Sequence, residues 1–382
     1  MSGQQASPSP PRAPGTFKIG TIAGSDVLVT SSWFVVAALI SVVVAPRVEQ
    51  VQPGLGPWKY VAGVAFAIVL YLSVLLHEAS HAYMARHYGF PVSSITLHFL
   101  GGVTAIEAEA TKPKQEFWIA VVGPLTSIGV GLASLGLWFV TPDGILKMVV
   151  EGLAGGNLLI GALNLVPGLP LDGGRVLKSA VWKATGNLHR GTVVAAWGGR
   201  ITAFAVLLWP LAQRELLDVE PDVFDFLLAF VIATFLWTGA SQALATAKVR
   251  SRIPHLVARN LARRTLSVPE DLPLAEAVRR ARDAAAGAIV TTTSSGRPVG
   301  VVNEAALLAT PEDRRPWLAV STVARGVDDG LALPVSISGE ALVRAITSTP
   351  ASEYVLLEDD GSVFGVLTTA DVDRAFREGP KS

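Results

Sequence analysis

Residues Leu75 to Gly89 read LLHEASHAYMARHYG and place two histidines and a glutamate near the end of an apolar run. The nearest charged residue before them is Lys59. On a helix His77 and His81, four residues apart, project from one face one turn apart, a spacing typical of metal ligands. Glu78 lies about 100° around the helix from His77, where it reaches a metal-bound water without ligating the metal. The stretch therefore predicts a hydrolytic metal site.

The chemistry of such a site explains its residue types. A metal lowers the pKa of bound water towards 7, and a neighbouring carboxylate takes the proton while the water attacks a carbonyl. Two imidazoles and one carboxylate leave a fourth position open, as in catalytic zinc sites. The chain has no cysteine, so histidine and carboxylate are the available ligands. The alternative is that these side chains reach the membrane interface, but an unpaired Glu78 within the bilayer would cost about 3 kcal/mol or more.

Composition indicates a membrane protein, because 50% of the 382 residues are hydrophobic and only 16% are charged. A helix needs about 20 apolar residues to cross a bilayer. Six apolar runs meet this need, at residues 27–46, 61–83, 117–140, 148–166, 192–212 and 223–247. The 31 basic and 31 acidic residues cancel, which gives no basic field for nucleic acid. The sequence predicts a polytopic α-helical protein with six spans.

Basic residues follow the even-numbered runs, as at Arg86, Arg175, Lys178 and Lys248. The positive-inside rule then places both termini in the cytoplasm and the HEASH stretch at the cytoplasmic end of the second span of this multi-pass cell-membrane protein. Residues 1–15, rich in Pro, Ser and Gln, are predicted to be a disordered tail.

A third metal ligand is predicted where the fourth run ends. Residues 157–177 read NLLIGALNLVPGLPLDGGRVL, and Asp172 is the only carboxylate between Glu151 and Glu215. The prolines and glycines around it must break a helix, and broken backbone at membrane depth occurs only where it is buried in protein or lines a wet cavity. The alternative for LDGG is an ordinary turn outside the membrane.

Together, HEASH on the second of six spans and NLVPGLPLDGG after the fourth resemble the site-2 protease family of intramembrane zinc metalloproteases (peptidase family M50). FKIGTIAGSDVLVTSSWF, HFLGGVTAIEAEA and AVVGPLTSIGVG resemble its N-terminal strands, its membrane-associated strand segment and its third-span Gly-Pro element. The resemblance covers residues 16 to about 247. It implies that His77, His81 and Asp172 bind one Zn²⁺ and that Glu78 is the catalytic base. It also implies that Asn164 lies near the substrate, whereas the alternative is a hydrogen bond between helices.

The strand segment, residues 92–109, has a physical role in this interpretation. A helical substrate must unwind before it can be cut, and an exposed strand edge would hold the unwound peptide by strand addition. Gly102 would then allow close approach of the substrate backbone. The alternative is a simple hairpin turn.

The predicted domains are residues 16–250, the membrane metalloprotease domain, and residues 251–382, a soluble α/β region. SGRPVGVVNEAALLA and DGSVFGVLTTADVDRA in the latter repeat one pattern of strand, turn, strand and helix. This resembles a tandem CBS-domain pair, which implies an adenine nucleotide site in which Thr368 contacts phosphate and Asp371 contacts ribose. In the first copy Ala306 replaces that carboxylate, so one site is expected. The alternative for Thr368 and Asp371 is a helix cap.

The predicted function is hydrolysis of peptide bonds in the transmembrane segments of single-span membrane proteins, such as a membrane-tethered transcription regulator, in regulated intramembrane proteolysis. The CBS pair would sense a nucleotide or support a homodimer. A CBS-gated transporter is one alternative, but it predicts matching halves that the sequence lacks. A non-cutting scaffold is another, although it would usually have lost Glu78 or a ligand.

Overall fold

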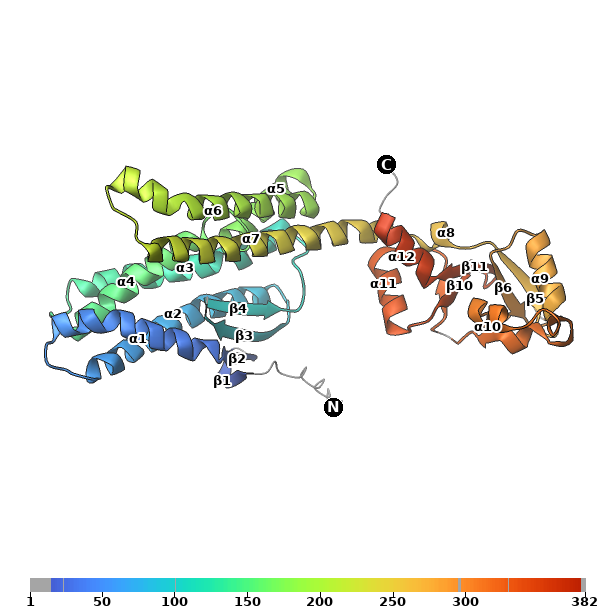
Figure 1. The fold of residues 1–382 in the computed structure, drawn as a ribbon, viewed down its shortest axis with the longest axis horizontal. Helices are drawn as coiled ribbons and strands as arrows, with labels where there is room; N and C mark the ends of the chain where they lie inside the picture. Colours follow the sequence, from blue (N-terminus) through green and yellow to red (C-terminus); the bar gives the residue numbers. More distant parts are fainter. Residues whose placement is uncertain (1–14, 23, 100, 295–296, 329, 379–382) are drawn as a thin grey trace. The chain divides into compact units, whose positions relative to one another are not determined.

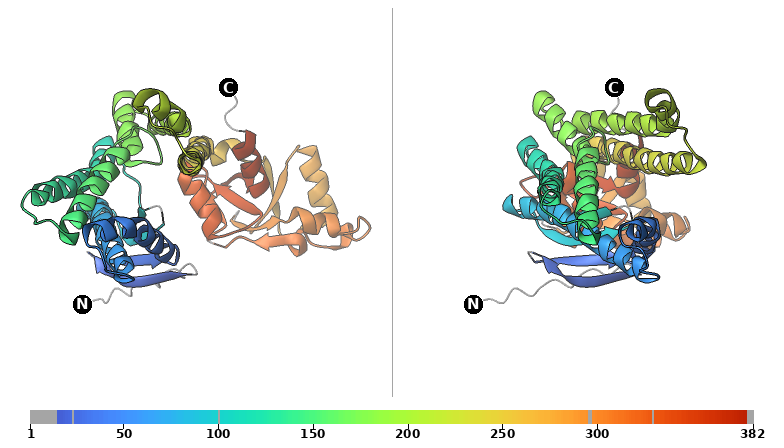
Figure 2. Two further views of the ribbon diagram at one scale, coloured as in Figure 1. Left: turned by 60° about the vertical axis from the view of Figure 1, so that its left-hand side comes forward. Right: turned by 90° about the vertical axis from the view of Figure 1, so that its left-hand side faces the viewer.

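The computed structural model describes residues 15–22, 24–99, 101–294, 297–328 and 330–378. Apart from Gly15, the predicted tail lies outside the described residues. The chain divides into two compact units, residues 1–247 and 248–382. Figures 1 and 2 draw both units, and each is described by itself below.

Among the described residues, six helices, all of which begin in the first unit, are long and apolar enough to cross a membrane, which confirms the predicted spans. They are α1 (Ser32–Val51), α2 (Trp58–His87), α3 (Pro113–Trp138), α4 (Ile145–Asn164), α6 (Leu188–Leu217) and α7 (Val223–Arg252). Large apolar side chains such as Leu39, Leu72 and Phe230 are about 60% exposed, because these faces meet lipid. Helix α2 packs against α1 and α3, and α3 packs against α4 and α5.

Helix α4 ends at Asn164 and the next helix begins at Asp172, so the predicted break in the helix is confirmed at residues 165–171. The helix that follows, α5 (Asp172–Thr185), was not predicted. It ends at Thr185, and the φ of 67° at Gly186 is the left-handed conformation of a helix C-cap. Arg175 and Lys178 therefore lie on a packed helix and are not solvated loop charges. Helix α5 packs on α3 and α6.

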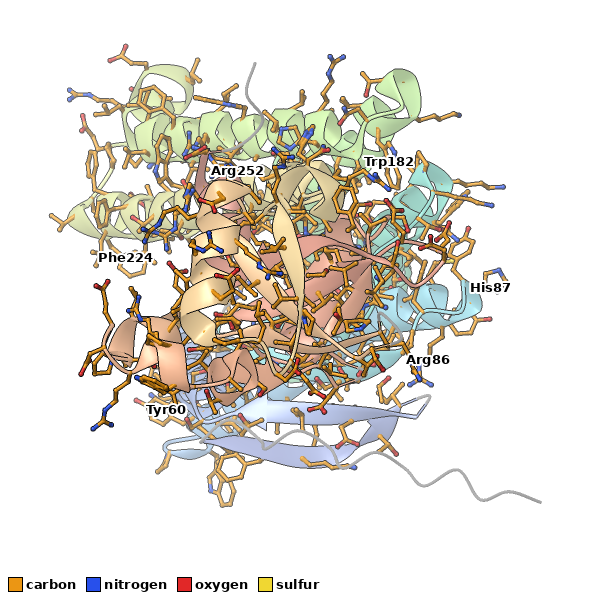
Figure 3. The ribbon with its side chains drawn as sticks, turned by 90° about the vertical axis from the view of Figure 1, so that its right-hand side faces the viewer. Tyr60, Arg86, His87, Trp182, Phe224 and Arg252 are labelled. Carbon is orange, nitrogen blue, oxygen red and sulfur yellow. The ribbon has the colours of Figure 1, made fainter. Side chains whose placement is uncertain are left out.

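A four-stranded sheet lies beside α2 (Figure 1). Its strands are β1 (Thr16–Ile22), β2 (Ser25–Thr30), β3 (Val92–His98) and β4 (Gly101–Ile106), in that order, with β2 and β3 parallel and the other pairs antiparallel. Arg86, labelled in Figure 3, holds the sheet to the end of α2, since its Nη2 donates to Ser25 Oγ at 2.9 Å and Val92 O at 3.0 Å. Within the described residues β4 is an edge strand, as the sequence predicted.

The second unit contains the predicted repeat of strand, strand and helix. After α8 (Ala258–Leu261), the first copy comprises β5 (Thr265–Pro269), α9 (Leu274–Asp283), β6 (Ala288–Thr292), β7 (Pro298–Val302), α10 (Glu304–Ala309) and β8 (Ala324–Gly326). The second comprises β9 (Ala332–Pro334), α11 (Gly339–Ser348), β10 (Glu353–Leu357), β11 (Val363–Thr368) and α12 (Thr369–Glu378). Short 3₁₀ turns occupy Ile253–His255, Arg315–Trp317 and Val320–Val323.

The two copies share a core. The sheets have the orders β5-β6-β7-β8 and β11-β10-β9. Val290 and Val301 from the first copy and Val355 and Val366 from the second are buried in one cluster. Burial of these four apolar side chains against one another stabilises the contact between the two copies, because each copy alone would expose them to water.

Candidate metal centre and catalytic cavity

The structure brings the three predicted metal ligands together. His77 and His81 are both 4% exposed on α2, and their Nε2 atoms lie 3.1 Å apart. Asp172 Oδ2, from the first turn of α5, lies 3.2 Å from each Nε2. Helix periodicity explains the histidine pair, and the packing of α5 on α3 brings the carboxylate to it.

The arrangement of donor atoms fits zinc. A circle through the three atoms has a radius of about 1.8 Å, close to the 2.0–2.2 Å of zinc bonds to histidine and carboxylate. His81 Nδ1 faces the carbonyl oxygen of Ile119 at 2.6 Å, so Nδ1 carries the proton, and a neutral ring then directs its Nε2 lone pair to the centre. His77 Nδ1 is held by Ser127 Oγ at 2.9 Å. The two Nε2 lone pairs and the Asp172 carboxylate face one another and repel unless a cation lies among them. The hydrogen bonds that hold the two Nδ1 atoms are also typical of histidines that bind a metal.

Gly123 lets α3 approach the two imidazoles. A Cβ atom at this position would lie 2.7 Å from His77 Nε2 and would overlap the His81 ring. Only glycine therefore fits beneath the rings. The sequence analysis noted this segment as a Gly-Pro element but did not identify Gly123 as part of the site.

Glu78 is buried, 8% exposed, and is oriented by β4. Thr104 Oγ1 donates to Glu78 Oε2 at 2.7 Å and lies 3.1 Å from the backbone oxygen of Glu78. A Cβ atom at Gly102 would overlap the Glu78 side chain. Gly102 thus gives room to Glu78, and because it also lines the cavity described below, its contact with a substrate backbone stays a prediction. Thr104 is a functional candidate that the sequence analysis missed.

Close packing of the segment before α5 fixes Asp172. Leu169 N donates to Ala195 O at 2.9 Å, and added Cβ atoms at Gly198 and Gly199 of α6 would overlap residues 167–169. Gly173 and Gly174 were predicted to break the helix, but they lie inside the first turn of α5, where side chains would overlap the backbone of residues 165–169. These contacts set the direction in which Asp172 projects.

A buried ion cluster joins α3 to α5 beside the predicted metal ligands. Glu116 is 5% exposed, and its Oε1 accepts from Arg175 Nε at 3.1 Å and lies 2.9 Å from Lys178 Nζ. Arg175 follows Asp172 by three residues, so both lie on one face of α5. The sequence analysis missed the cluster because the carboxylate and the two cations are about 60 residues apart in the chain.

A cavity of about 540 Å³ opens onto these groups. Its walls come from α2, β4, α4, α5 and α7, and they include His77, Glu78, His81, Gly102, Thr104, Asn164, Asp172, Arg175 and Phe235. The predicted substrate residue Asn164 thus lines the same space as the ligands and Glu78.

In the second unit, Thr368 and Asp371 form the helix cap that was the alternative interpretation. Asp371 N donates to Thr368 Oγ1 at 3.1 Å, and Thr368 Oγ1 donates to Asp371 Oδ2 at 2.7 Å. Asn303 caps α10 in the same way in the first copy, through a 2.9 Å bond from Ala306 N. Arg263 Nε also donates to Asp371 at 2.6 Å, and this bond holds the pKa of Asp371 below its usual value.

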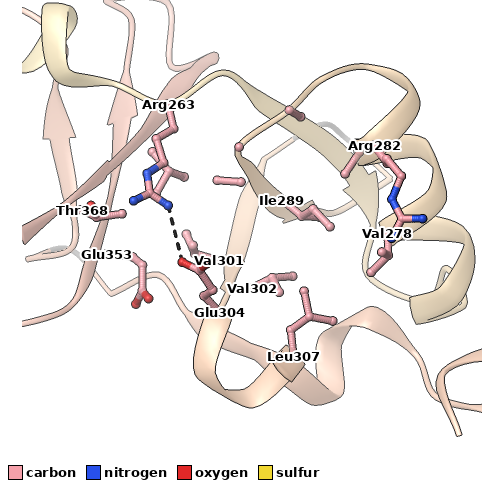
Figure 4. A pocket seen from close by; sticks show the side chains of 15 residues that line it. Arg263, Val278, Arg282, Ile289, Val301, Val302, Glu304, Leu307, Glu353 and Thr368 are labelled. Atoms are coloured by element: carbon pink, nitrogen blue, oxygen red, sulfur yellow. Dashed lines mark hydrogen bonds and ion pairs between the residues drawn. The ribbon is translucent and has the colours of Figure 1, made fainter. Parts of the chain in front are cut away.

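A cavity of about 320 Å³ lies between the two copies (Figure 4). Its walls are largely apolar, with Val278, Ile289, Val301 and Val366, and its polar groups include Arg263, Glu304, Glu353 and Thr368. Asp371 lines a different cavity, with Arg252 and Arg374. The two predicted nucleotide contacts therefore touch each other but face different spaces.

Comparison with known proteins identifies the family. Residues 65–152 and 140–208 match the model of peptidase family M50, and residues 258–312 match that of the CBS domain. "Putative zinc metalloprotease sll0528" of Synechocystis sp. is 26% identical over 93% of this chain and 94% of its own length. "Putative zinc metalloprotease Rip3" of Mycobacterium tuberculosis is 38% identical over 51% of each chain.

A solved structure, the site-2 protease from Methanocaldococcus jannaschii, aligns at 25% identity with a TM-score of 0.42, covering 60% of this chain and 95% of that one. The two family-model matches fall on the six-span unit and on the repeat unit, respectively. The chain therefore contains a metallopeptidase domain of family M50, followed by a C-terminal CBS domain region.

Proposed function

We propose that this chain cuts peptide bonds within the transmembrane segments of single-span membrane proteins. In this proposal His77, His81 and Asp172 hold one zinc ion, and Glu78 is the general base. The supporting observation is the convergence of three donor atoms from two helices, 3.1–3.2 Å apart, beside a buried glutamate and at the edge of a cavity.

The bound zinc would acidify water and polarise the scissile carbonyl. Glu78 accepts a proton as the water oxygen bonds to the carbonyl carbon, and it returns a proton to the leaving nitrogen as the C–N bond breaks. Thr104 keeps the Glu78 carboxylate in one orientation through its 2.7 Å bond. The products are a new carboxyl terminus and a new amino terminus, so atoms and protons balance.

The substrate would bind as an unwound strand. On the side away from β3, β4 pairs with no strand of the described residues, and strand addition there would hold an extended peptide beside Glu78. Asn164, which lines the same cavity, would donate its amide to the scissile carbonyl oxygen.

The basic residues that follow the even-numbered spans support an orientation with both termini and the CBS region in the cytoplasm. Lys248, Arg250 and Arg252 after the last span fit this orientation. A cut near the HEASH end of α2 then releases a cytoplasmic fragment. Regulated intramembrane proteolysis of a membrane-tethered regulator is the process that such a release would serve.

The CBS region would be the regulatory module. The apolar walls of the 320 Å³ cavity suit an adenine ring, and Arg263 offers donors to phosphate, whereas Glu304 and Glu353 offer acceptors to ribose hydroxyls. Thr368 would contact phosphate only by giving up the bond that it donates to Asp371. Calorimetric titration of the purified chain with AMP and ATP tests this role. Arg263→Ala is expected to weaken binding, and absence of heat with either nucleotide would exclude it. Sedimentation analysis tests the homodimer.

The decisive experiment compares the wild type with Glu78→Gln in proteoliposomes. Both proteins are expected to hold about one zinc per chain, and only the wild type is expected to cut a panel of single-span substrates. Glu107→Gln, the same chemical change at an exposed glutamate just after β4, is the matched control and should cut normally. Equal cutting by wild type and Glu78→Gln would refute the role of Glu78.

A further inference from the structure

The 540 Å³ cavity has a cationic side chain in its wall, Arg175, to which the proposed reaction assigns no role. Arg175 lines the cavity together with Glu78 and Asp172. Among the described residues its guanidinium makes one hydrogen bond, from Nε to Glu116 Oε1 at 3.1 Å. Neither terminal nitrogen, Nη1 or Nη2, has a hydrogen-bond partner among the described residues. An arginine fixed through Nε presents its remaining N–H groups in a rigid plane, which is suited to an oxygen anion.

Glu116 holds Arg175 in place but neutralises its charge only in part, because Glu116 also pairs with a second cation. The same Oε1 atom lies 2.9 Å from Lys178 Nζ, so one carboxylate is shared by two cations. Lys178 does not line the cavity. The formal charge of the cluster and its neighbours is one negative charge, from the carboxylates of Glu78, Glu116 and Asp172 and the cations of Arg175 and Lys178. A divalent ion at the site would change this to one positive charge. Such a site favours one additional negative charge on the substrate.

We propose that Arg175 is a further catalytic residue, whose terminal N–H groups stabilise the negative charge that develops on the scissile carbonyl oxygen. The inference rests on the proposed proteolytic function. As the water oxygen bonds to the carbonyl carbon, the π electrons of the C=O bond move onto oxygen, and Arg175 donates hydrogen bonds to it without losing a proton. When the C–N bond breaks, the electron pair returns. Glu116 is the positioning residue that acts through Arg175.

The matched pair of variants is Arg175→Met and Lys178→Met. Each removes one cation from the same Glu116 oxygen on the same helix, but only the first removes a group that lines the cavity. Loss of one preorganised oxyanion donor typically lowers kcat by about 10²–10³-fold. We expect this loss in Arg175→Met with KM changed less than about 3-fold, and nearly normal kcat in Lys178→Met.

Two further variants separate chemistry from folding. Arg175→Gln keeps a polar side chain of moderate length and replaces Arg175→Met if the latter does not fold. Arg175→Lys keeps the charge without the planar fork and should recover part of kcat. Glu116→Gln should lower kcat less than Arg175→Met does, because Arg175 stays charged but is less firmly held. Zinc content and thermal midpoint are measured for every variant.

A binding measurement provides a readout independent of turnover. The probe is a phosphinic peptide with the flanking sequence of a cut substrate, which carries a tetrahedral anion where the carbonyl would be. Its Kd should rise about 100-fold in Arg175→Met and less than about 3-fold in Lys178→Met. Binding of the uncut substrate to Glu78→Gln should change little when Arg175→Gln is added. A merely structural arginine would instead weaken both ligands equally.

The outcomes distinguish this inference from the proposed function. If the wild type cuts no substrate, the proposed function fails, and if wild type and Glu78→Gln cut equally, the role of Glu78 is refuted. If only the wild type cuts, but Arg175→Met or Arg175→Gln holds zinc and has a kcat within about 3-fold of wild type, the Arg175 proposal alone is overturned. Equal losses of kcat and thermal midpoint in Arg175→Met and Lys178→Met would also overturn it, because the cluster would then act only in folding.

Discussion

Replacing Gly123 by alanine should disable the metal site without unfolding the protein. The added Cβ would lie 2.7 Å from His77 Nε2 and would overlap the His81 ring. Ordinary contacts begin at about 3.4 Å, so both rings must move by roughly 1 Å, whereas metal–ligand distances tolerate about 0.2 Å. The rings cannot yield freely, because Ser127 and Ile119 hold their Nδ1 atoms.

The magnitude follows from that displacement. Overpacking of this kind costs about 1–3 kcal/mol of stability, which most folded proteins survive. A misplacement of about 1 Å at reacting groups lowers rates about 10²-fold, and disturbed support of a ligand weakens metal binding by about 10–100-fold. We therefore expect Gly123→Ala to bind zinc at least 10-fold more weakly and to cut at least 100-fold more slowly.

The assay measures zinc affinity by competition with a chromogenic chelator, and cutting of a model substrate in proteoliposomes. Gly129→Ala is the control, because this glycine lies on the same helix with no atom within 4 Å of its added Cβ. It should bind zinc and cut like the wild type. The reasoning would be refuted if Gly123→Ala matched Gly129→Ala in both measurements.

Three further predictions concern Glu78, the metal and the CBS region. Thr104→Val should lower kcat about 10-fold or more with zinc retained, since a hydrogen bond to a charged group contributes about 1.5–3 kcal/mol. Thr126→Val is the control and should cut normally, because the Thr126 hydroxyl donates to Val122 O within α3. Removal of zinc with 1,10-phenanthroline should abolish cutting and Zn²⁺ should restore it, while recovery with Mg²⁺ would speak against the imidazole ligands. Because bonding to Arg263 lowers the pKa of Asp371 on folding, the ionised side chain stabilises the second unit at neutral pH, and this stabilisation is lost as pH falls through the lowered pKa. Hydrogen exchange of α12 should accordingly be faster in Asp371→Asn than in wild type at pH 7 and similar in both well below pH 4, and a gap that persisted in acid would contradict the assignment.

The sequence predicted those parts of the site that depend on local periodicity. His77 and His81 are one helical turn apart, so their pairing follows from α2 alone, and six apolar runs define six spans. Helix α5 was missed because prolines precede it and two glycines lie in its first turn, a composition that is also typical of a loop. Tertiary contacts decided that this segment is helical.

Long-range contacts account for the other residues that were missed. Gly123 matters because α3 passes beneath the imidazoles, and Thr104 matters because β4 faces Glu78. Arg175 and Lys178 were interpreted only as basic residues that follow an even-numbered run, because nothing near them in the chain indicates that Glu116 would lie against them. Such partners become apparent only when the packing of α3, α5 and the sheet is known.

X-ray absorption at the zinc edge of the purified chain tests the central claim most directly. The claim predicts about one zinc per chain, with nitrogen and oxygen neighbours at about 2.0–2.2 Å and outer scattering from two imidazoles. Asp172→Ala should lose zinc or change that spectrum, and His77→Ala should lose the signal of one imidazole. A wild type that cuts without zinc, or a spectrum unchanged in both variants, would contradict the claim.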